Sequence, residues 1–126
     1  MADDPVAVLI VDDQAPFRRA ARAVVGVTPG FEVVAEAETG EEAVELVERH
    51  RPGLVLMDIN MPGINGIEAT RRITAGHPET VVLLVSTYNA NDLPGDARTC
   101  GAVDYVNKEE LGPDVLVDVW SRHAPA

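Results

Sequence analysis

Polar side chains stand at or just after the ends of four apolar runs in this sequence. They are the carboxylates Asp12, Asp13 and Asp58, the hydroxyl of Ser86 and the amine of Lys108. In a sheet of parallel strands all carboxyl ends lie at one edge, so these groups can converge although they are remote in the chain. Three carboxylates in one crevice repel each other and raise at least one pKa unless a cation is present. The set therefore favours Mg²⁺ together with a phosphoryl group, whose oxygens the metal and the amine would neutralise.

Asp58 is the residue around which the others would gather. It closes the apolar run Leu54–Met57, and the eight residues after it hold one proline, two glycines and two asparagines. This pattern indicates a short buried strand followed by a loop. A carboxylate there needs a cation, a donor or solvent. An aspartate that merely opens a turn is the alternative, and the polar residues at the other strand ends argue against it.

Lys108 is the only lysine among the 10 basic side chains, the others being arginine. A compact ammonium suits a crowded cluster of anionic oxygens in a way that a planar guanidinium does not. The alternative is an ordinary solvated surface lysine.

Length and composition bound the class of protein. The chain has 126 residues, 46% of them apolar, which is enough for one compact domain with a core;. No apolar run approaches the ~20 residues that span a bilayer, and Asp3 and Asp4 disfavour a secretory signal. A single cysteine, Cys100, excludes an internal disulfide and fits a small buried side chain in a reducing cytoplasm. The net charge of −11 disfavours direct binding of nucleic acid;.

Strand-like and helix-like segments alternate, which predicts an α/β domain with a mainly parallel sheet. Five strands are expected, at Val6–Val11, Phe31–Ala37, Leu54–Met57, Val81–Val85 and Ala102–Val106. Five helices are expected between and after them: from Pro16, from Gly40 to Arg51, from about Gly66 to Ala75, within 89–100, and from Gly112–Pro113. The apolar positions of the first helix, which should face inward, are Phe17, Ala20, Ala21, Val24 and Val25;. Trp120 belongs to the apolar stripe of the last helix;.

Two local expectations qualify this scheme. The helix within 89–100 should be short or start late, because Pro94 and Gly95 lie in its middle and a proline inside a helix costs ~3 kcal/mol;. The three histidines show no metal-ligand spacing and are expected at the surface; they are His50, His77 and His123.

The chain resembles the receiver domains of bacterial two-component response regulators over residues 5 to 123. The resemblance rests on Asp12-Asp13, the run Met57–Gly63 with Gly66, Ser86, and Tyr105–Lys108. It is similar above all to the branch usually fused to helix-turn-helix output domains, because Glu109 stands where many receivers have proline. The resemblance implies a flavodoxin-like, doubly wound (βα)5 fold with strand order 2-1-3-4-5. It also implies one receiver domain over residues 1–126, with core 5–123 and no output domain.

The resemblance assigns roles in phosphoryl transfer to five of these residues. Asp58 would be the phospho-acceptor and a metal ligand, receiving its phosphoryl group from a phosphohistidine. Asp13 would be a direct Mg²⁺ ligand, the backbone carbonyl of Asn60 a further one, and Asp12 would act through water. Lys108 would pair with the phosphoryl group.

Four residues would switch the conformation of the domain or tune the lifetime of the aspartyl phosphate. The resemblance implies that Ser86 moves to hydrogen-bond the phosphoryl oxygen and that Tyr105 swings inward behind it, although Tyr105 is also open to plain core packing. Asn60 and Tyr88, two residues beyond Asp58 and Ser86, would tune how fast the aspartyl phosphate hydrolyses. The residues do not say in which direction this pair acts.

These features predict a cytoplasmic phosphoacceptor module whose Mg²⁺-dependent phosphorylation at Asp58 switches protein–protein interactions. Its partners would be a sensor histidine kinase or phosphotransfer protein and an effector or larger assembly. No enzymatic turnover is expected beyond self-catalysed phosphoryl transfer to and from Asp58. A constitutive adaptor is the main alternative, favoured by the disturbed fourth helix. A Mg²⁺-dependent phosphatase is a weaker one, because no insert is large enough to form a cap over a substrate.

Overall fold

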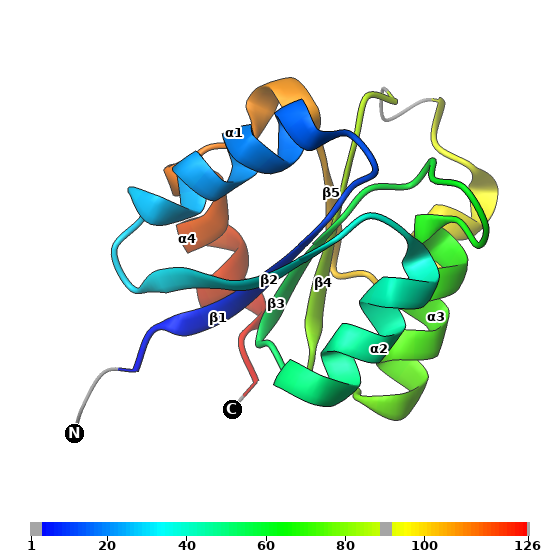
Figure 1. Cartoon of the computed structure of the whole chain (residues 1–126), viewed down its shortest axis with the longest axis horizontal. Coiled ribbons are helices and arrows are strands. Elements are labelled where there is room, and N and C mark those ends of the chain that lie inside the picture. Colours follow the sequence, from blue (N-terminus) through cyan, green and yellow to red (C-terminus); the bar gives the residue numbers. More distant parts are fainter. Residues whose placement is uncertain (1–3, 89–91, 126) are drawn as a thin grey trace.

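The computed structural model describes residues 4–88 and 92–125. Its centre is a parallel sheet with strand order β2-β1-β3-β4-β5 (Figure 1). The strands are β1 (Val6–Val11), β2 (Phe31–Ala37), β3 (Leu54–Met57), β4 (Val81–Ser86) and β5 (Asp104–Asn107). The predicted fold class and strand order are therefore confirmed.

Four α-helices cover the two faces of this sheet. They are α1 (Ala15–Gly26), α2 (Gly40–His50), α3 (Gly66–Gly76) and α4 (Pro113–His123). α1 and α4 pack on one face and α2 and α3 on the other, so the core consists of two apolar clusters separated by the sheet (Figure 1). Along β1, Leu9 and Val11 belong to one cluster and Val8 and Ile10 to the other. A strand buried on both faces needs such an unbroken apolar run.

The segment between β4 and β5 differs from the expected five-helix scheme. Within the described residues it holds a 3₁₀-helix, η2 (Gly95–Arg98), in place of an α-helix, and a second one, η3 (Lys108–Glu110), follows β5. The expectation of a short or late-starting helix is confirmed, although the element is a 3₁₀-helix, so that the described residues form four rather than five α-helices. Pro94 is the N-cap of η2, and its ring is incompatible with a helix continuing through it. Residues 89–91, the beginning of the expected span, lie outside the described residues.

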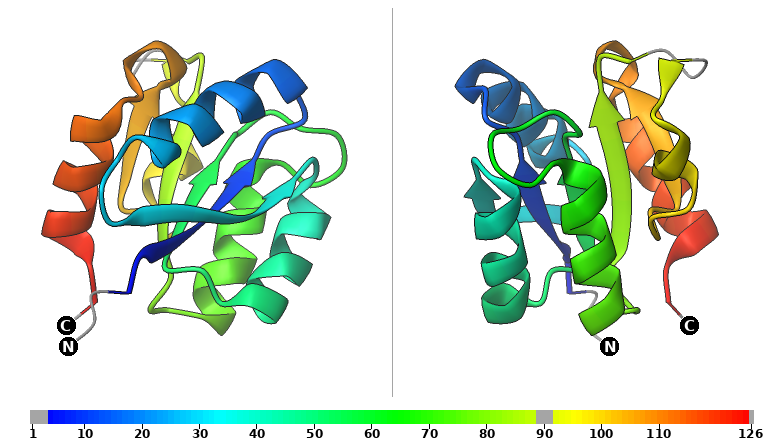
Figure 2. Two further views of the ribbon diagram at one scale, coloured as in Figure 1. Left: turned by 60° about the vertical axis from the view of Figure 1, so that its left-hand side comes forward. Right: turned by 90° about the vertical axis from the view of Figure 1, so that its right-hand side faces the viewer.

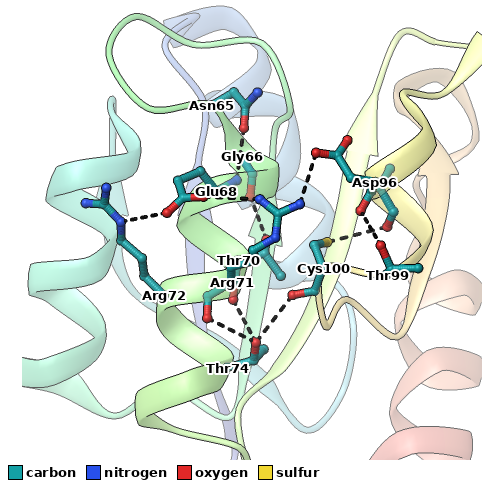
Figure 3. A network of polar contacts seen from close by, with 11 residues as sticks. Asn65, Gly66, Glu68, Thr70, Arg71, Arg72, Thr74, Asp96, Thr99 and Cys100 are labelled. Atoms are coloured by element: carbon teal, nitrogen blue, oxygen red, sulfur yellow. Dashed lines mark hydrogen bonds and ion pairs between the residues drawn. The ribbon is translucent and has the colours of Figure 1, made fainter.

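Polar contacts tie the η2 segment to α3. Arg71 Nη2 lies 3.0 Å from Asp96 Oδ2, and the Thr74 hydroxyl lies 3.4 Å from the carbonyl oxygen of Cys100. Figure 3 shows this network, in which Arg71 also contacts Glu68 on its own helix. These contacts add to the packing of the same segment, in which Ala97 and Cys100 are buried in the core.

Three expectations of detail are wrong. β5 begins at Asp104 rather than Ala102, since its ladder with β4 starts at the pair Leu83–Asp104. Ala20 is exposed, because α1 turns Ala21 and Val25 toward the sheet. His77 is buried at 7% exposure, and its Nε2 lies 2.7 Å from Glu48 Oε2 of α2. That partner is 29 residues away in the chain, so local spacing gave no sign of it.

The loops after β1, β3 and β5 gather at one end of the sheet. Figure 2 shows the start of α1, the loop after β3 and the segment after β5 together there in both views. Across residues 4–88 and 92–125, no helix has the length and apolar character needed to cross a membrane.

Candidate functional site

Three carboxylates converge at this end of the sheet. Oxygens of Asp12, Asp13 and Asp58 all lie within 4.8 Å of one another. Asp12 is fully buried and Asp58 is 6% exposed, whereas Asp13 is exposed to solvent. The sequence predicted that these acids would meet, but it did not predict that the two neighbours at the end of β1 would differ in burial.

Asp12 is held in place by the beginning of α1. Its Oδ1 accepts a hydrogen bond of 2.8 Å from the backbone N–H of Gln14, and its carbonyl oxygen accepts one of 2.7 Å from Arg18 Nη1. Its own N–H donates to the carbonyl of Ala37 on β2. Oδ1 and the backbone are thus committed to the fold, and Oδ2 faces the pocket.

Asp58 is fixed by β1 on one side and by the beginning of α3 on the other. Its backbone N–H donates to the carbonyl of Val11 over 2.9 Å. The loop after it returns to the sheet at Gly66, whose N–H donates to the carbonyl of Ile59 over 2.8 Å. The next helix starts there because Asn65 Oδ1 caps it by accepting from the N–H of Glu68. The loop is therefore closed tightly behind the Asp58 carboxylate.

Lys108 brings its ammonium between the two buried acids. Nζ lies 2.6 Å from Asp12 Oδ2 and 3.7 Å from Asp58 Oδ1. The lysine side chain is only 12% exposed, and Nζ also lies 4.6 Å from the centroid of the Phe17 ring. The amine therefore rests closer to Asp12 than to Asp58. The alternative of a solvated surface lysine is excluded.

The pocket perturbs the ionisation of Asp58. Burial raises the pKa of its carboxyl to about 7, the negative charge of Asp12 adds to this, and the ammonium of Lys108 opposes it. Burial and like charges both disfavour the ionised carboxylate. A divalent cation among these oxygens would reverse the effect. The donor set fits such an ion, because it consists of carboxylate oxygens without histidine or cysteine, as hard cations prefer;.

Ser86 and Tyr105 lie next to each other at the end of β4. Ser86 is 1% exposed, and its Oγ accepts a long hydrogen bond of 3.4 Å from the N–H of Tyr88. The hydroxyl of Tyr105 donates to the carbonyl of Ser86 over 3.3 Å, and burial raises the pKa of that phenol. The tyrosine is therefore already packed behind the serine in this structure.

Asn60 and Tyr88 form a hydrogen-bonded pair that sequence reasoning did not anticipate. Asn60 Nδ2 donates to the Tyr88 hydroxyl over 3.0 Å, and the same hydroxyl lies 3.3 Å from Asn60 Oδ1. The two residues come from the loops after β3 and β4, 28 positions apart. Asn107, which lies in the Tyr105–Lys108 motif, donates to the carbonyls of Thr87 and Tyr88 over 3.4 Å.

The ring of Phe17 against Lys108 is a second feature that the sequence did not reveal. The helical spacing of Phe17 indicated only that this residue faces the core from α1. Nothing in that spacing says which part of a distant strand end lies against the ring.

Known proteins share both the sequence pattern and the fold. Residues 8–120 match the family described as response regulator receiver domain. The transcriptional regulatory protein DegU of Brevibacillus brevis is 39% identical over 116 residues, which cover 92% of this chain and 49% of DegU. The chain thus spans about half the length of that curated relative.

Two solved structures illustrate the likeness in three dimensions. The response regulator domain of Thermotoga maritima CheB aligns with a TM-score of 0.83 at 31% identity, covering 93% of this chain and 95% of that one. A chain from the CheX–CheY–BeF₃–Mg²⁺ complex of Borrelia burgdorferi aligns with a TM-score of 0.80 at 30% identity, covering 97% and 92%.

Proposed function

This chain belongs to the response regulator receiver domain family, and from that premise we propose that Asp58 is its phospho-acceptor. The observation that carries the proposal is the position of Asp58. Its carboxylate is buried beside two other acids and lies 3.7 Å from the ammonium of the only lysine. A carboxylate whose pKa is about 7 gains most from a cation that compensates the negative charges around it;.

Receiver domains bind Mg²⁺ at an acidic pocket, and we propose which residues would hold it here. Asp13 and Asp58 would be direct ligands, with the backbone carbonyl of Asn60. Asp12 would act through water, because its Oδ2 is already engaged by Lys108 at 2.6 Å. The exposure of Asp13 supports its direct role, since its carboxylate can turn toward an ion that arrives from solvent. When bound, the ion would neutralise the phosphoryl oxygens.

The transfer step follows from the carboxylate and the ammonium. An oxygen of Asp58 attacks the phosphorus of a phosphohistidine, an O–P bond forms as the N–P bond breaks, and the imidazole nitrogen keeps the electron pair. The product is an acyl phosphate. Lys108 would shift from Asp12 toward the new phosphoryl oxygens, where charge-assisted hydrogen bonds are strong.

The switch and the partners are part of the same proposal. Ser86 would turn its hydroxyl to the phosphoryl group, and Tyr105 would stay behind it in the packed position. A sensor histidine kinase or phosphotransfer protein would supply phosphate in the cytoplasm, and an effector would read the change. We propose no further enzymatic turnover. Nothing in the pocket favours the constitutive adaptor, for which the state of Asp58 would not matter.

A small phosphodonor tests the acceptor directly. With acetyl phosphate and Mg²⁺, intact-mass measurement should find one added phosphate on the wild-type chain and none on Asp58→Asn. Asp118→Asn is the matched control, because Asp118 is exposed on α4 and its side chain pairs with Arg122 of the same helix. An unmodified wild type, or equal modification of wild type and Asp58→Asn, would contradict the proposal.

Removal of the Tyr88 hydroxyl should shorten the lifetime of the aspartyl phosphate. Tyr88→Phe releases the Asn60 amide from its 3.0 Å hydrogen bond, so the amide becomes free to orient water beside Asp58. One lost hydrogen bond corresponds to about a two- to tenfold faster loss of phosphate. The decay is followed by intact mass after the donor is removed. A lifetime equal to that of the wild type would show that the pair does not control hydrolysis.

A further inference from the structure

The aromatic ring of Phe17 forms a wall of the pocket that the phosphoryl-transfer proposal leaves without a role. Phe17 lies in the first turn of α1, and the segment after β5 that carries Lys108 lies beside that turn (Figure 1). The ring is half-buried and packs against the apolar cluster between α1, α4 and the sheet. Its face lies 4.6 Å from Lys108 Nζ, within the range of a cation–π contact;.

The ammonium of Lys108 therefore has three attractive neighbours of different kinds. Asp12 holds it at 2.6 Å, Asp58 attracts it from 3.7 Å, and the ring lies at 4.6 Å. Two of these attractions change when a phosphoryl group forms on Asp58, because the ammonium must leave Asp12 for the new oxygens. A cation–π contact persists wherever the ammonium lies over the ring face within about 6 Å of the centroid, so the ring can keep the amine in the pocket during that shift.

We propose that Phe17 is a positioning residue, whose ring holds the Lys108 ammonium inside the pocket while the amine moves from Asp12 toward a phosphoryl group on Asp58. This inference rests on the proposed role of Asp58. The physical need for it lies in the lysine stem, whose four flexible carbons give the side chain many rotamers. The Lys108 side chain is only 12% exposed in the pocket. Without the ring, its amine would move out of the pocket into water more easily.

A purely structural role makes a different prediction. If Phe17 only fills space between α1 and the sheet, leucine should serve nearly as well, because it has a similar volume and no π-face. The chain offers a matched control in Phe31, its second phenylalanine, which packs on the same cluster and contacts Trp120 edge-on at a centroid distance of 6.4 Å. Phe31→Leu therefore imitates the loss of packing at a ring that contacts Trp120 rather than Lys108.

The first test observes the amine itself and does not depend on activity. Because Lys108 is the only lysine, ¹³C-lysine labelling gives one side-chain set in an NMR spectrum. The ε-methylene protons should resonate upfield of an exposed lysine through the ring current of Phe17. This shift should be retained in Phe17→Tyr and Phe31→Leu and lost in Phe17→Leu. An ε-methylene signal at the exposed-lysine position in the wild type would overturn the proposal, and that measurement requires no variant.

The second test measures the rate of phosphorylation by acetyl phosphate at saturating Mg²⁺. Phe17→Leu should react about 5- to 30-fold more slowly, the fold-change that corresponds to losing a desolvated cation–π contact. Phe17→Tyr should restore the rate, and Phe31→Leu should match the wild type. Equal rates for Phe17→Leu and the wild type, or equal slowing in the leucine and tyrosine variants, would overturn the proposal. A wild type that takes no phosphate contradicts the role of Asp58 instead, while the lysine signal still tests the position of the ring.

Discussion

Replacement of Gly66 by alanine should destabilise the domain by about 3 kcal/mol and suppress phosphorylation of Asp58. A Cβ at this position would collide with the backbone carbonyl oxygen of Asp58 and approach Ile59 Cα to 3.0 Å. Both neighbours are backbone atoms, so the strain cannot be relieved by rotating a side chain. Overpacking of this kind costs typically 1–3 kcal/mol and sometimes more. The loop after β3 would move, and the acceptor carboxylate would move with it.

Gly76 supplies the control within the same helix. It ends α3, and a Cβ there would meet nothing within 4 Å. Gly76→Ala should therefore be neutral or stabilising by ~0.5 kcal/mol, since alanine restricts the unfolded chain more than glycine does. Urea unfolding gives the free energies, and intact mass after acetyl phosphate treatment gives the acceptor function. Equal stability of the two alanine variants would show that the close approach at Gly66 does not constrain the fold.

The sequence predicts the strands that position this site because each strand depends on a local pattern of residues. The run Leu54–Met57 is uniformly apolar, and all four residues are buried. Acids that directly follow β1 and β3 must reach the same edge once these strands pair in parallel, as they do from Val8–Leu54 to Val11–Met57. Pro94 likewise predicts the late start of η2 by a steric rule that needs no partner.

Contacts between elements are what the sequence could not supply. The Asn60–Tyr88 hydrogen bond, the ring of Phe17 against Lys108, and the burial of His77 against Glu48 each join residues from different elements. Each depends on how two loops or helices lie relative to one another. The periodicity within one element contains no information about that relation. The same holds for β5, whose first residue depends on where its hydrogen-bonded pairing with β4 begins.

In metal-free buffer, Asp58→Asn should be more stable than the wild type above neutral pH. The pKa of Asp58 is about 7 in the folded protein against an ordinary value of 3.8, chiefly because of burial and the charge of Asp12. From about pH 4 to pH 7 the folded chain therefore holds a proton that the unfolded chain has released. The unfolded state binds fewer protons in this window, so the free energy of unfolding falls as pH rises and levels off above pH 7.

The size of the effect follows from the difference between the two pKa values. That difference, 7 − 3.8, is about 3 units, which at 1.36 kcal/mol per unit corresponds to about 4 kcal/mol;. Asparagine is neutral throughout, so the advantage of Asp58→Asn should be largest at pH 8 and shrink toward pH 4. Asp118→Asn, at an exposed site, should follow the wild type within ~0.5 kcal/mol;. Urea unfolding at several pH values in the presence of a chelator provides the comparison.

Addition of Mg²⁺ should then reduce the advantage of Asp58→Asn over the wild type. An ion that binds only the folded state stabilises it by RT ln(1 + [Mg²⁺]/Kd), about 2.7 kcal/mol at 100 times Kd. The wild type should gain this stabilisation increasingly as pH rises toward 7, because the proton on Asp58 competes with the ion for the same oxygens. Asp58→Asn lacks the titrating ligand and should gain less at every pH. A variant that is less stable than the wild type at pH 8 without metal would mean that Lys108 already compensates the charge of Asp58, and that the pocket needs no metal ion to hold three acids together.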